Sequence, residues 1–179
     1  MKFTPTKLTG SYLIEFDKKA DERGFFARSW CSKEMQRHGL SGNIAQINTS
    51  VSKDKGTLRG LHYQVAPYQE CKTIRCTRGA IFDVIVDLRA DSPTFLQWFG
   101  TELTEDNHHS LYSPEGFAQG FITLQDNTEI TYLTSKSYAP GYDRGVRWND
   151  PRIQIQLPID IVAISDKDKS WSDLTFPIS

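Results

Sequence analysis

The chain has 179 residues, which favours one domain spanning residues 1–179 with a core large enough to fold alone. Charged residues make up 24% of the chain and the net charge is −1, so the composition offers no basic face for nucleic acid. No apolar run is long enough to cross a bilayer and the N-terminus lacks the apolar stretch of a signal peptide. We therefore expect a cytoplasmic protein without a membrane partner.

The first 52 residues are predicted to contain short strands and one helix. Residues 12–16 give the clearest early strand, because apolar and aromatic side chains dominate it. A short helix is predicted over residues 32–38, with Ser32 as its cap and Gly39 at its end. A further strand is predicted over residues 43–52.

Residues 56–64, Gly-Thr-Leu-Arg-Gly-Leu-His-Tyr-Gln, place a histidine among apolar residues and glycines. Alternation along a strand puts His62 and Gln64 on one face and Arg59 on the opposite face. Small and polar neighbours suit a histidine that lines a cavity. A half-buried core histidine with satisfied hydrogen bonds explains the segment equally well.

Short strands with Gly, Pro and Asn punctuation continue through the rest of the chain. They are predicted over residues 73–77, 80–89, 95–103, 111–112, 120–124, 129–134 and 147–148. In residues 80–89, Phe82 and Val84 face one way, whereas Asp83 and Asp87 face the other. This pattern indicates an all-β antiparallel sandwich or barrel, with one helical turn in the tail after residue 159.

A cupin-like barrel often binds a metal through paired histidines, and this sequence lacks the pairing. Gln64 stands two residues after His62, and a possible second ligand motif ends in Gln119. His108 and His109 are adjacent, so on a strand they point to opposite faces. The odd number of cysteines contains no metal-type pair, and free thiols are expected at Cys31, Cys71 and Cys76. We therefore predict no metal site.

A single histidine in a metal-free site suggests acid–base chemistry, with a carboxylate orienting its second nitrogen. The sequence leaves three candidates for that carboxylate: Asp83, Asp87 and Asp168. Tyrosines that can donate a proton, or else only pack in the core, are Tyr63, Tyr132 and Tyr138. Cations that can bind a phosphate, or else only face solvent, are Lys72, Arg59, Arg23 and Arg75.

Several motifs occur together and in a defined order. They are residues 21–26, Gln46 with Asn48, residues 56–64, Lys72, residues 82–95, residues 114–118, Tyr132, Tyr138, residues 148–151 and residues 165–168. With these motifs the chain resembles the dTDP-4-dehydrorhamnose 3,5-epimerase family, which acts on nucleotide-linked 4-keto-6-deoxy sugars. The resemblance covers almost the whole chain.

The resemblance implies a fold, an assembly and a set of roles. The fold is a cupin-type jelly-roll β-sandwich, and the assembly is a homodimer that exchanges N-terminal strands. No metal or redox cofactor is implied. His62 is the expected base, Asp168 orients it, Tyr132 is the acid on the opposite face of the sugar, and Lys72 lies near the ketone oxygen. The remaining expected substrate-binding residues are Arg23, which serves the neighbouring subunit, and Arg28, Gln46, Asn48, Arg59, Gln119 and Tyr138.

Three departures from the family pattern involve four positions. Gln119 stands where histidine is usual, Arg28 where glutamate is usual, and Glu70 with Cys71 where a Gln-Gly pair is common. An arginine cannot accept a hydrogen bond from a nucleobase, so we predict that dTDP is not the preferred nucleotide. The identity of the nucleotide and the choice between C3, C5 or both stay open.

The leading prediction is an epimerase that inverts C3, C5 or both in deoxysugar biosynthesis for a cell-surface polysaccharide such as the O-antigen of lipopolysaccharide. One alternative is a single-centre epimerase on a related sugar nucleotide. Others are a sugar-nucleotide-binding cupin without catalysis and a metal-dependent cupin enzyme. The single-centre epimerase retains the chemistry of proton exchange. The sugar-nucleotide-binding cupin does not require an acid and a base on opposite faces.

Overall fold

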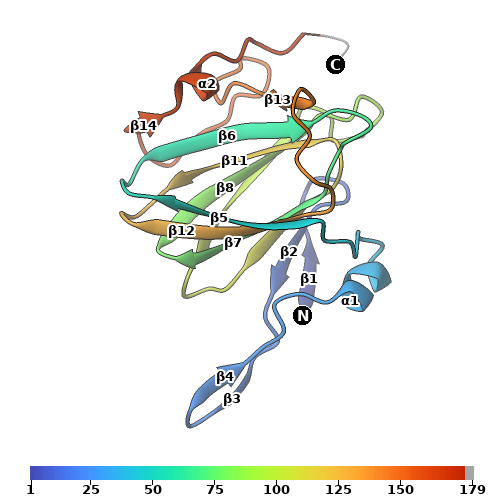
Figure 1. Cartoon of the computed structure of the whole chain (residues 1–179), viewed down its shortest axis with the longest axis vertical. Helices are drawn as coiled ribbons and strands as arrows, with labels where there is room; N and C mark the ends of the chain where they lie inside the picture. Colours follow the sequence, from blue (N-terminus) through green and yellow to red (C-terminus); the bar gives the residue numbers. More distant parts are fainter. Residues whose placement is uncertain (176–179) are drawn as a thin grey trace.

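The computed structural model describes residues 1–175 as two facing β-sheets with a hairpin that projects from one end (Figure 1). The first sheet has the strand order β1-β2-β10-β7-β12-β5 and is antiparallel. Its strands are β1 (Lys2–Pro5), β2 (Tyr12–Glu15), β10 (Ser110–Ser113), β7 (Lys72–Arg78), β12 (Thr128–Thr134) and β5 (Gln46–Ser52).

The second sheet has the order β13-β6-β11-β8-β9, and β14 pairs in parallel with β6. Its strands are β13 (Asp143–Gly145), β6 (Thr57–Gln64), β11 (Phe117–Thr123), β8 (Ala80–Asp87), β9 (Trp98–Thr104) and β14 (Ala163–Ile164). The helices of the described residues are α1 (Ser32–Arg37) and α2 (Asp166–Lys169). The predicted all-β sandwich with a few short helices is therefore confirmed.

Strand β8 shows why the chain forms two layers. Its predicted alternation is confirmed, because Ile81 and Ile85 are buried in the core cluster between the sheets. Val84 and Val86 instead join a second cluster, where the C-terminal segment covers the outer face of the second sheet. Each such buried side chain stabilises the fold by about 1.5–3 kcal/mol.

Helix α1 covers the outer face of the β1-β2-β10 part of the first sheet. Met35 packs there in a third cluster with Ile14 and Tyr112. The predicted cap is wrong by one residue, since Cys31 is the N-cap and makes no side-chain hydrogen bond to the helix. The predicted end is confirmed at Gly39, whose φ of +73° is readily adopted by glycine.

Two predicted strands differ from the structure. The strand predicted over residues 95–103 begins only at Trp98, because Leu96 has a φ of +60° that an extended strand does not contain. The strand predicted at residues 147–148 is absent, and the chain turns there instead. Strand β13, Asp143–Gly145, takes its place beside β6.

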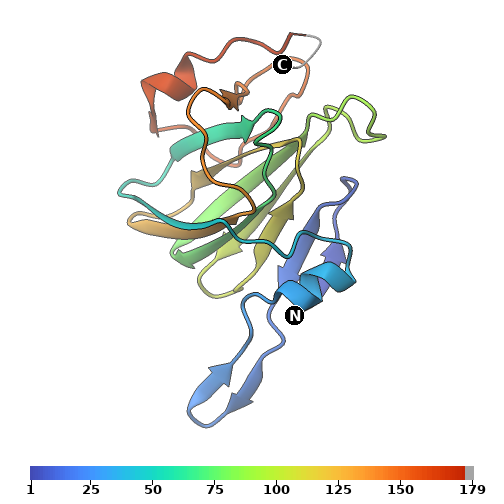
Figure 2. The ribbon, with the colours of Figure 1, turned by 45° about the vertical axis from the view of Figure 1, so that its right-hand side comes forward.

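The hairpin of β3 (Lys19–Asp21) and β4 (Gly24–Phe26) extends away from both sheets (Figure 2). Its aromatic side chains are not buried by this chain, and 73% of Phe26 is exposed. An apolar hairpin of this kind gains stability when another surface covers it.

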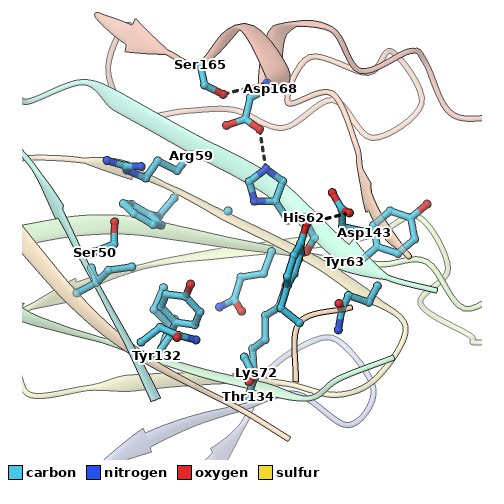
Figure 3. A pocket seen from close by; sticks show the side chains of 18 of the residues that line it. Ser50, Arg59, His62, Tyr63, Lys72, Tyr132, Thr134, Asp143, Ser165 and Asp168 are labelled. Atoms are coloured by element: carbon cyan, nitrogen blue, oxygen red, sulfur yellow. Dashed lines mark hydrogen bonds and ion pairs between the residues drawn. The ribbon is translucent and has the colours of Figure 1, made fainter. Parts of the chain in front are cut away.

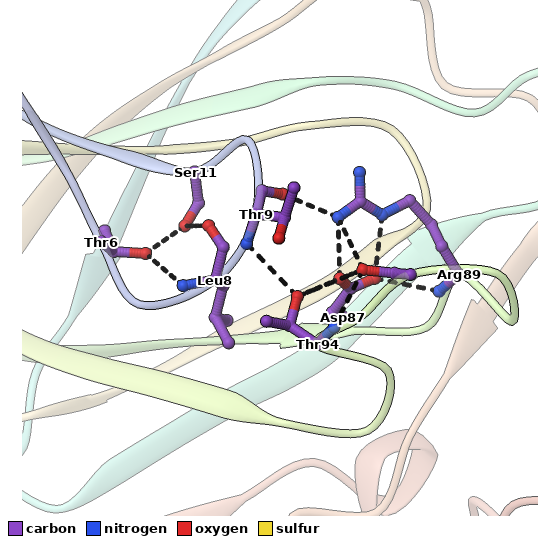
Figure 4. A network of polar contacts seen from close by, with 8 residues as sticks. Thr6, Leu8, Thr9, Ser11, Asp87, Arg89 and Thr94 are labelled. Carbon is purple, nitrogen blue, oxygen red and sulfur yellow. Dashed lines mark hydrogen bonds and ion pairs between the residues drawn. The ribbon is translucent and has the colours of Figure 1, made fainter.

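A buried polar network joins the end of β8 to the loop between β1 and β2 (Figure 4). Asp87 accepts hydrogen bonds from the Arg89 guanidinium and from the hydroxyls of Ser92 and Thr94, at distances of 2.5–2.9 Å. Arg89 also donates to the carbonyl oxygen of Thr9 at 2.7 Å. Asp87 is therefore committed to holding these segments together and does not orient His62.

Replacing Asp87 by asparagine should lower the free energy of unfolding by about 3 kcal/mol at pH 7, because it removes one partner of a buried ion pair. Burial raises the pKa of Asp87, but the hydrogen bonds from Arg89, Ser92 and Thr94 outweigh it and leave the pKa lowered. The carboxylate therefore stabilises the fold above the unfolded pKa of about 3.9, and this contribution is lost as the pH falls through the lower folded value.

Urea denaturation at pH 7 and at pH 3 measures this effect. The difference between the wild type and Asp87→Asn should shrink at pH 3, because this pH lies below the unfolded pKa of about 3.9 and the unfolded chain then binds a proton more readily than the folded chain. The exposed neighbour Asp91 makes a matched control, and Asp91→Asn should leave stability unchanged. A difference for Asp87→Asn that is the same at both pH values contradicts the assignment.

Candidate active site

A cavity of about 610 Å³ lies between the two sheets, within the usual size range of small-molecule sites (Figure 3). Its walls come from β5, β7 and β12 of the first sheet and from β6 and β11 of the second. The segment that carries β14 and α2 completes the wall beside β6. The prediction that His62, within residues 56–64, lines a cavity is therefore confirmed.

A bulge in β6 turns two functional side chains into the same cavity. His62 pairs with Gln119 of β11 and Arg59 pairs with Phe121, so the single residue Gly120 lies opposite two residues of β6. Arg59 and His62 both line the cavity. The prediction that they occupy opposite faces is therefore wrong, because the bulge interrupts the alternation.

Glycine is required at the bulge by the close approach of the two strands. A Cβ atom on Gly60 would lie 2.7 Å from the Cα atom of Gly120, and Gly60 has a φ of +108°. Any larger side chain would separate β6 from β11 and displace His62.

His62 forms a short hydrogen bond with Asp168, the nearest carboxylate. The distance between His62 Nε2 and Asp168 Oδ1 is 2.6 Å. The second oxygen of Asp168 accepts from the Gly60 N–H at 3.2 Å. Ser165 caps α2 by accepting from the Asp168 N–H at 3.0 Å, which fixes the backbone that carries the carboxylate.

The environment of Asp168 keeps it ionised. Burial raises the pKa of its carboxyl, but the hydrogen bond and charge of His62 and the N–H of Gly60 outweigh burial and leave the pKa lowered. Because a carboxylate only accepts, Nε2 of His62 carries a proton and Nδ1 is the basic nitrogen. The His62 side chain is 43% exposed, and it lines the cavity, so a ligand can reach it.

The first sheet places a tyrosine and a lysine in the cavity opposite β6. Tyr132 comes from β12, and burial raises the pKa of its hydroxyl more than the charge of Arg59 lowers it. The hydroxyl is therefore protonated at neutral pH. Lys72 comes from β7, and its ammonium donates to the carbonyl oxygen of His62 at 2.8 Å.

Five of the predicted substrate-binding residues line the same cavity: Gln46, Asn48, Arg59, Gln119 and Tyr138. Gln46 accepts from the backbone N–H of Tyr138 at 2.7 Å, which ties β5 to the loop before β13. Gln119 donates to Asp83 at 2.9 Å, so Asp83, like Asp87, is occupied elsewhere and does not orient His62.

Two predicted substrate-binding residues do not reach this cavity. Arg23 lies in the turn of the projecting hairpin and pairs with Asp21 at 2.5 Å. Arg28 follows the hairpin and pairs with Glu34 at 3.0 Å. Both arginines lie outside the cavity because the β3–β4 hairpin carries this part of the chain away from the sheets (Figure 2).

Sequence reasoning missed an ion pair and a buried acid in the cavity wall. Asp143 and Lys167 lie 2.5 Å apart, and Asp143 also accepts from the Tyr138 hydroxyl at 3.1 Å. The hydrogen bond from Lys167 lowers the pKa of Asp143. Glu70 lies beside Lys72 at 3.1 Å. Lys167 directly precedes Asp168 in the motif over residues 165–168, and this position in the motif was the sequence signal that could have identified it.

The thiol prediction is confirmed, since Cys31, Cys71 and Cys76 are free. Across residues 1–175, no group of three or more His, Cys, Asp or Glu side chains is arranged to hold a metal ion. In the same part of the chain, no helix has the length and apolar character needed to cross a membrane.

Comparison with known proteins gives consistent matches over the full length. The family model described as dTDP-4-dehydrorhamnose 3,5-epimerase matches residues 5–175. A relative of that name from Methanothermobacter thermautotrophicus is 41% identical over 176 residues, which cover 97% of this chain and 94% of the relative.

Solved structures agree in fold. The dTDP-4-dehydrorhamnose 3,5-epimerase of Bacillus anthracis, solved with TDP and PPi bound, has a TM-score of 0.92 and 43% identity, covering 97% of this chain and 99% of that one. A 3'-monoepimerase from Streptomyces bikiniensis, solved with dTDP-quinovose, has a TM-score of 0.85 and 33% identity, covering 94% of this chain and 86% of that one. The predicted cupin-type fold is confirmed, and the chain belongs to the dTDP-4-dehydrorhamnose 3,5-epimerase family of isomerases.

Proposed function

We propose that the protein inverts C3, C5 or both of a nucleotide-linked 4-keto-6-deoxyhexose through an enolate. The observation that carries the proposal is the His62–Asp168 pair in a cavity that Tyr132 enters from the opposite sheet. This arrangement offers a base and an acid on two sides of one ligand. Inversion at carbon requires both, whereas binding alone requires neither.

In the proposed reaction, Nδ1 of His62 removes a proton from the carbon next to the C4 ketone. That proton is acidic only because the enolate spreads its charge onto the ketone oxygen. The ammonium of Lys72 stabilises this oxygen electrostatically, which is worth several kcal/mol in a site that excludes water. Tyr132 then donates a proton to the carbon from the other face, and each positioned acid or base contributes about 10²–10⁴-fold.

The nucleotide part of the substrate is proposed from the cavity and from relatives. Arg59, with Gln46 and Asn48, supplies a cation and two amides to the region expected to hold the sugar and phosphates. Solved relatives hold TDP or a dTDP-linked sugar. The prediction that Arg28 disfavours dTDP stays a prediction, and calorimetry with dTDP, CDP and GDP tests it.

A single-centre epimerase is the second candidate. The chain resembles a 3'-monoepimerase as well as 3,5-epimerases, and Gln119 pairs directly with His62 across β6 and β11. An amide at this position donates to a ligand but does not titrate. The biological setting that we propose for either candidate is cytoplasmic deoxysugar biosynthesis for a cell-surface polysaccharide such as O-antigen.

Incubation in deuterium oxide with dTDP-, CDP- and GDP-linked 4-keto-6-deoxy sugars tests the function. Deuterium should enter at C3, C5 or both, and the product should have inverted configuration at each exchanging carbon. Exchange at one carbon alone selects the single-centre candidate. A sugar nucleotide that binds without any exchange contradicts the catalytic proposal and favours the binding protein.

We also propose that the active form is a homodimer in which the N-terminal strands cross to the partner. The hairpin carries Arg23 beyond its own cavity, and the exposed Phe26 on it lacks a cover. On the outer face of edge strand β5, Ile47 is 63% exposed and Val51 is 49% exposed. Monomers rarely leave such an apolar edge strand open.

Changing Ile47 to glutamate should convert the dimer to a monomer, because the charge would be buried in the interface without a partner. Light scattering at micromolar concentration measures the mass. The matched control is Val162→Glu, since Val162 is also exposed but lies on the C-terminal segment. A wild-type monomer, or a dimer that Ile47→Glu leaves intact, contradicts this assembly.

A further inference from the structure

Glu70 is a buried acid that touches two donors in the cavity wall. Its Oε1 lies 3.1 Å from the ammonium of Lys72, and its Oε2 accepts from the Gln64 side chain at 2.7 Å. Resting on the proposed function, we propose that Glu70 is a positioning residue that holds the Lys72 ammonium at the place where the enolate oxygen forms. Neither the family pattern nor the sequence motifs assigned Glu70 a role.

The surroundings of Gln64 favour a carboxylate at position 70 in this chain. The nitrogen of its amide faces the carbonyl oxygens of Tyr68 and Ser137 at 3.0 and 3.3 Å, as well as Glu70. Its oxygen accepts from the Ala139 N–H at 2.6 Å. The amide therefore cannot turn over without placing its oxygen against carbonyl oxygens.

Position 70 thus receives a donor from each side, one from Gln64 and one from Lys72. A carboxylate accepts both, since each of its oxygens is an acceptor. A neutral amide has one acceptor oxygen, and its NH₂ group would face the second donor. Glutamate therefore keeps both contacts, whereas glutamine in the same place keeps one of them.

Lys72 has three N–H donors, and the structure accounts for two of them. One points to Glu70 and one donates to the carbonyl oxygen of His62 at 2.8 Å. These two anchors leave the third donor for a ligand in the cavity that Lys72 lines. A donor fixed before the reaction stabilises a developing oxyanion without having to reorganise.

The neighbouring acid does not replace Glu70 as the charged partner. Asp83 is fully buried on β8, outside the lining of the cavity, and one of its oxygens accepts from Gln119. Burial raises the pKa of Asp83 well above its usual range, and the hydrogen bond from Gln119 and the charge of Lys72 reverse only part of that effect. Asp83 is therefore protonated more readily than an ordinary aspartate, whereas Glu70 makes the direct ion pair with Lys72.

The test is a double-mutant cycle between Glu70 and Lys72, read by deuterium exchange on a substrate that the wild type converts. Glu70→Gln should lower the rate at saturating substrate about tenfold and change KM less than about threefold, because the ammonium is misplaced rather than removed. In the Lys72→Gln background, the same change should cost less than about twofold. Equal costs in both backgrounds, or no kinetic effect, overturn the proposal.

The matched control is Glu102→Gln, because Glu102 is an exposed glutamate on β9 whose side chain lies away from the cavity. It should retain the wild-type rate and KM. Thermal unfolding of every variant separates lost folding from lost rate, since a purely structural Glu70 would lower Tm without lowering the rate of the folded fraction.

A second measurement decides the proposal independently of activity. In ¹H–¹⁵N spectra of lysine ammonium groups, the signal that disappears in Lys72→Gln belongs to Lys72. Glu70→Gln should shift and broaden this signal, whereas Glu102→Gln should not. An unchanged signal overturns the role of Glu70. Absence of exchange by the wild type would instead overturn the proposed function, and the spectra would still decide Glu70.

Discussion

Replacing His62 by alanine should abolish proton exchange at every substrate carbon. His62 is the one histidine that the described cavity wall contains, because His38, His108 and His109 lie outside it. The carboxylate of Asp168 cannot take over at a similar rate, since an aspartate is ordinarily a much weaker base than an imidazole. Loss of the base should cost at least about 10²–10⁴-fold in exchange rate.

Proton NMR in deuterium oxide measures the loss, and calorimetry with a nucleoside diphosphate checks that the variant still folds and binds. Asp168→Asn should be milder, because it disturbs the tautomer and orientation of His62 but leaves the base in place. Exchange by His62→Ala within tenfold of the wild-type rate would exclude His62 as the base.

The candidate active site could be predicted only in part from the sequence. The segment over residues 57–64 and the alternation of β8 follow from local pattern, because strand periodicity depends on neighbouring residues alone. The bulge in β6 does not follow. It requires Gly120 on another strand to approach Gly60, and a single strand carries no record of its partner's register.

Long-range pairing likewise decides the polar contacts. Three aspartates were equal candidates to orient His62, and α2 brings Asp168 to it across 106 positions of sequence. Asp87 is held by Arg89 only two residues away, which is a local contact that the sequence allowed but did not require. Asp143 and Lys167 meet only because β13 and α2 lie on the same side of β6.

Tyr132→Phe should separate proton exchange from inversion. The substitution keeps the ring, which packs against the core between the sheets, and removes only the hydroxyl. His62, Asp168 and Lys72 remain, so the enolate should still form. Without a proton donor on the second face, His62 should return the proton to the face from which it came.

Substrate recovered from this variant in deuterium oxide should contain deuterium at the exchanging carbon with its original configuration. The wild type should give deuterium with inversion. Separation of the epimers followed by proton NMR distinguishes the two results. Tyr138→Phe is the matched control, because Tyr138 is 58% exposed and its hydroxyl already donates to Asp143. It should retain inversion.

The two ways in which this prediction can fail have different meanings. Inversion by Tyr132→Phe at the wild-type rate would mean that another group is the acid, and loss of inversion in Tyr138→Phe would then identify it. Loss of both exchange and inversion in Tyr132→Phe would place the hydroxyl earlier in the reaction, at the sugar or the enolate. Exchange without inversion is expected because burial raises the pKa of the Tyr132 hydroxyl, which keeps it a proton donor and makes it a poor base at neutral pH.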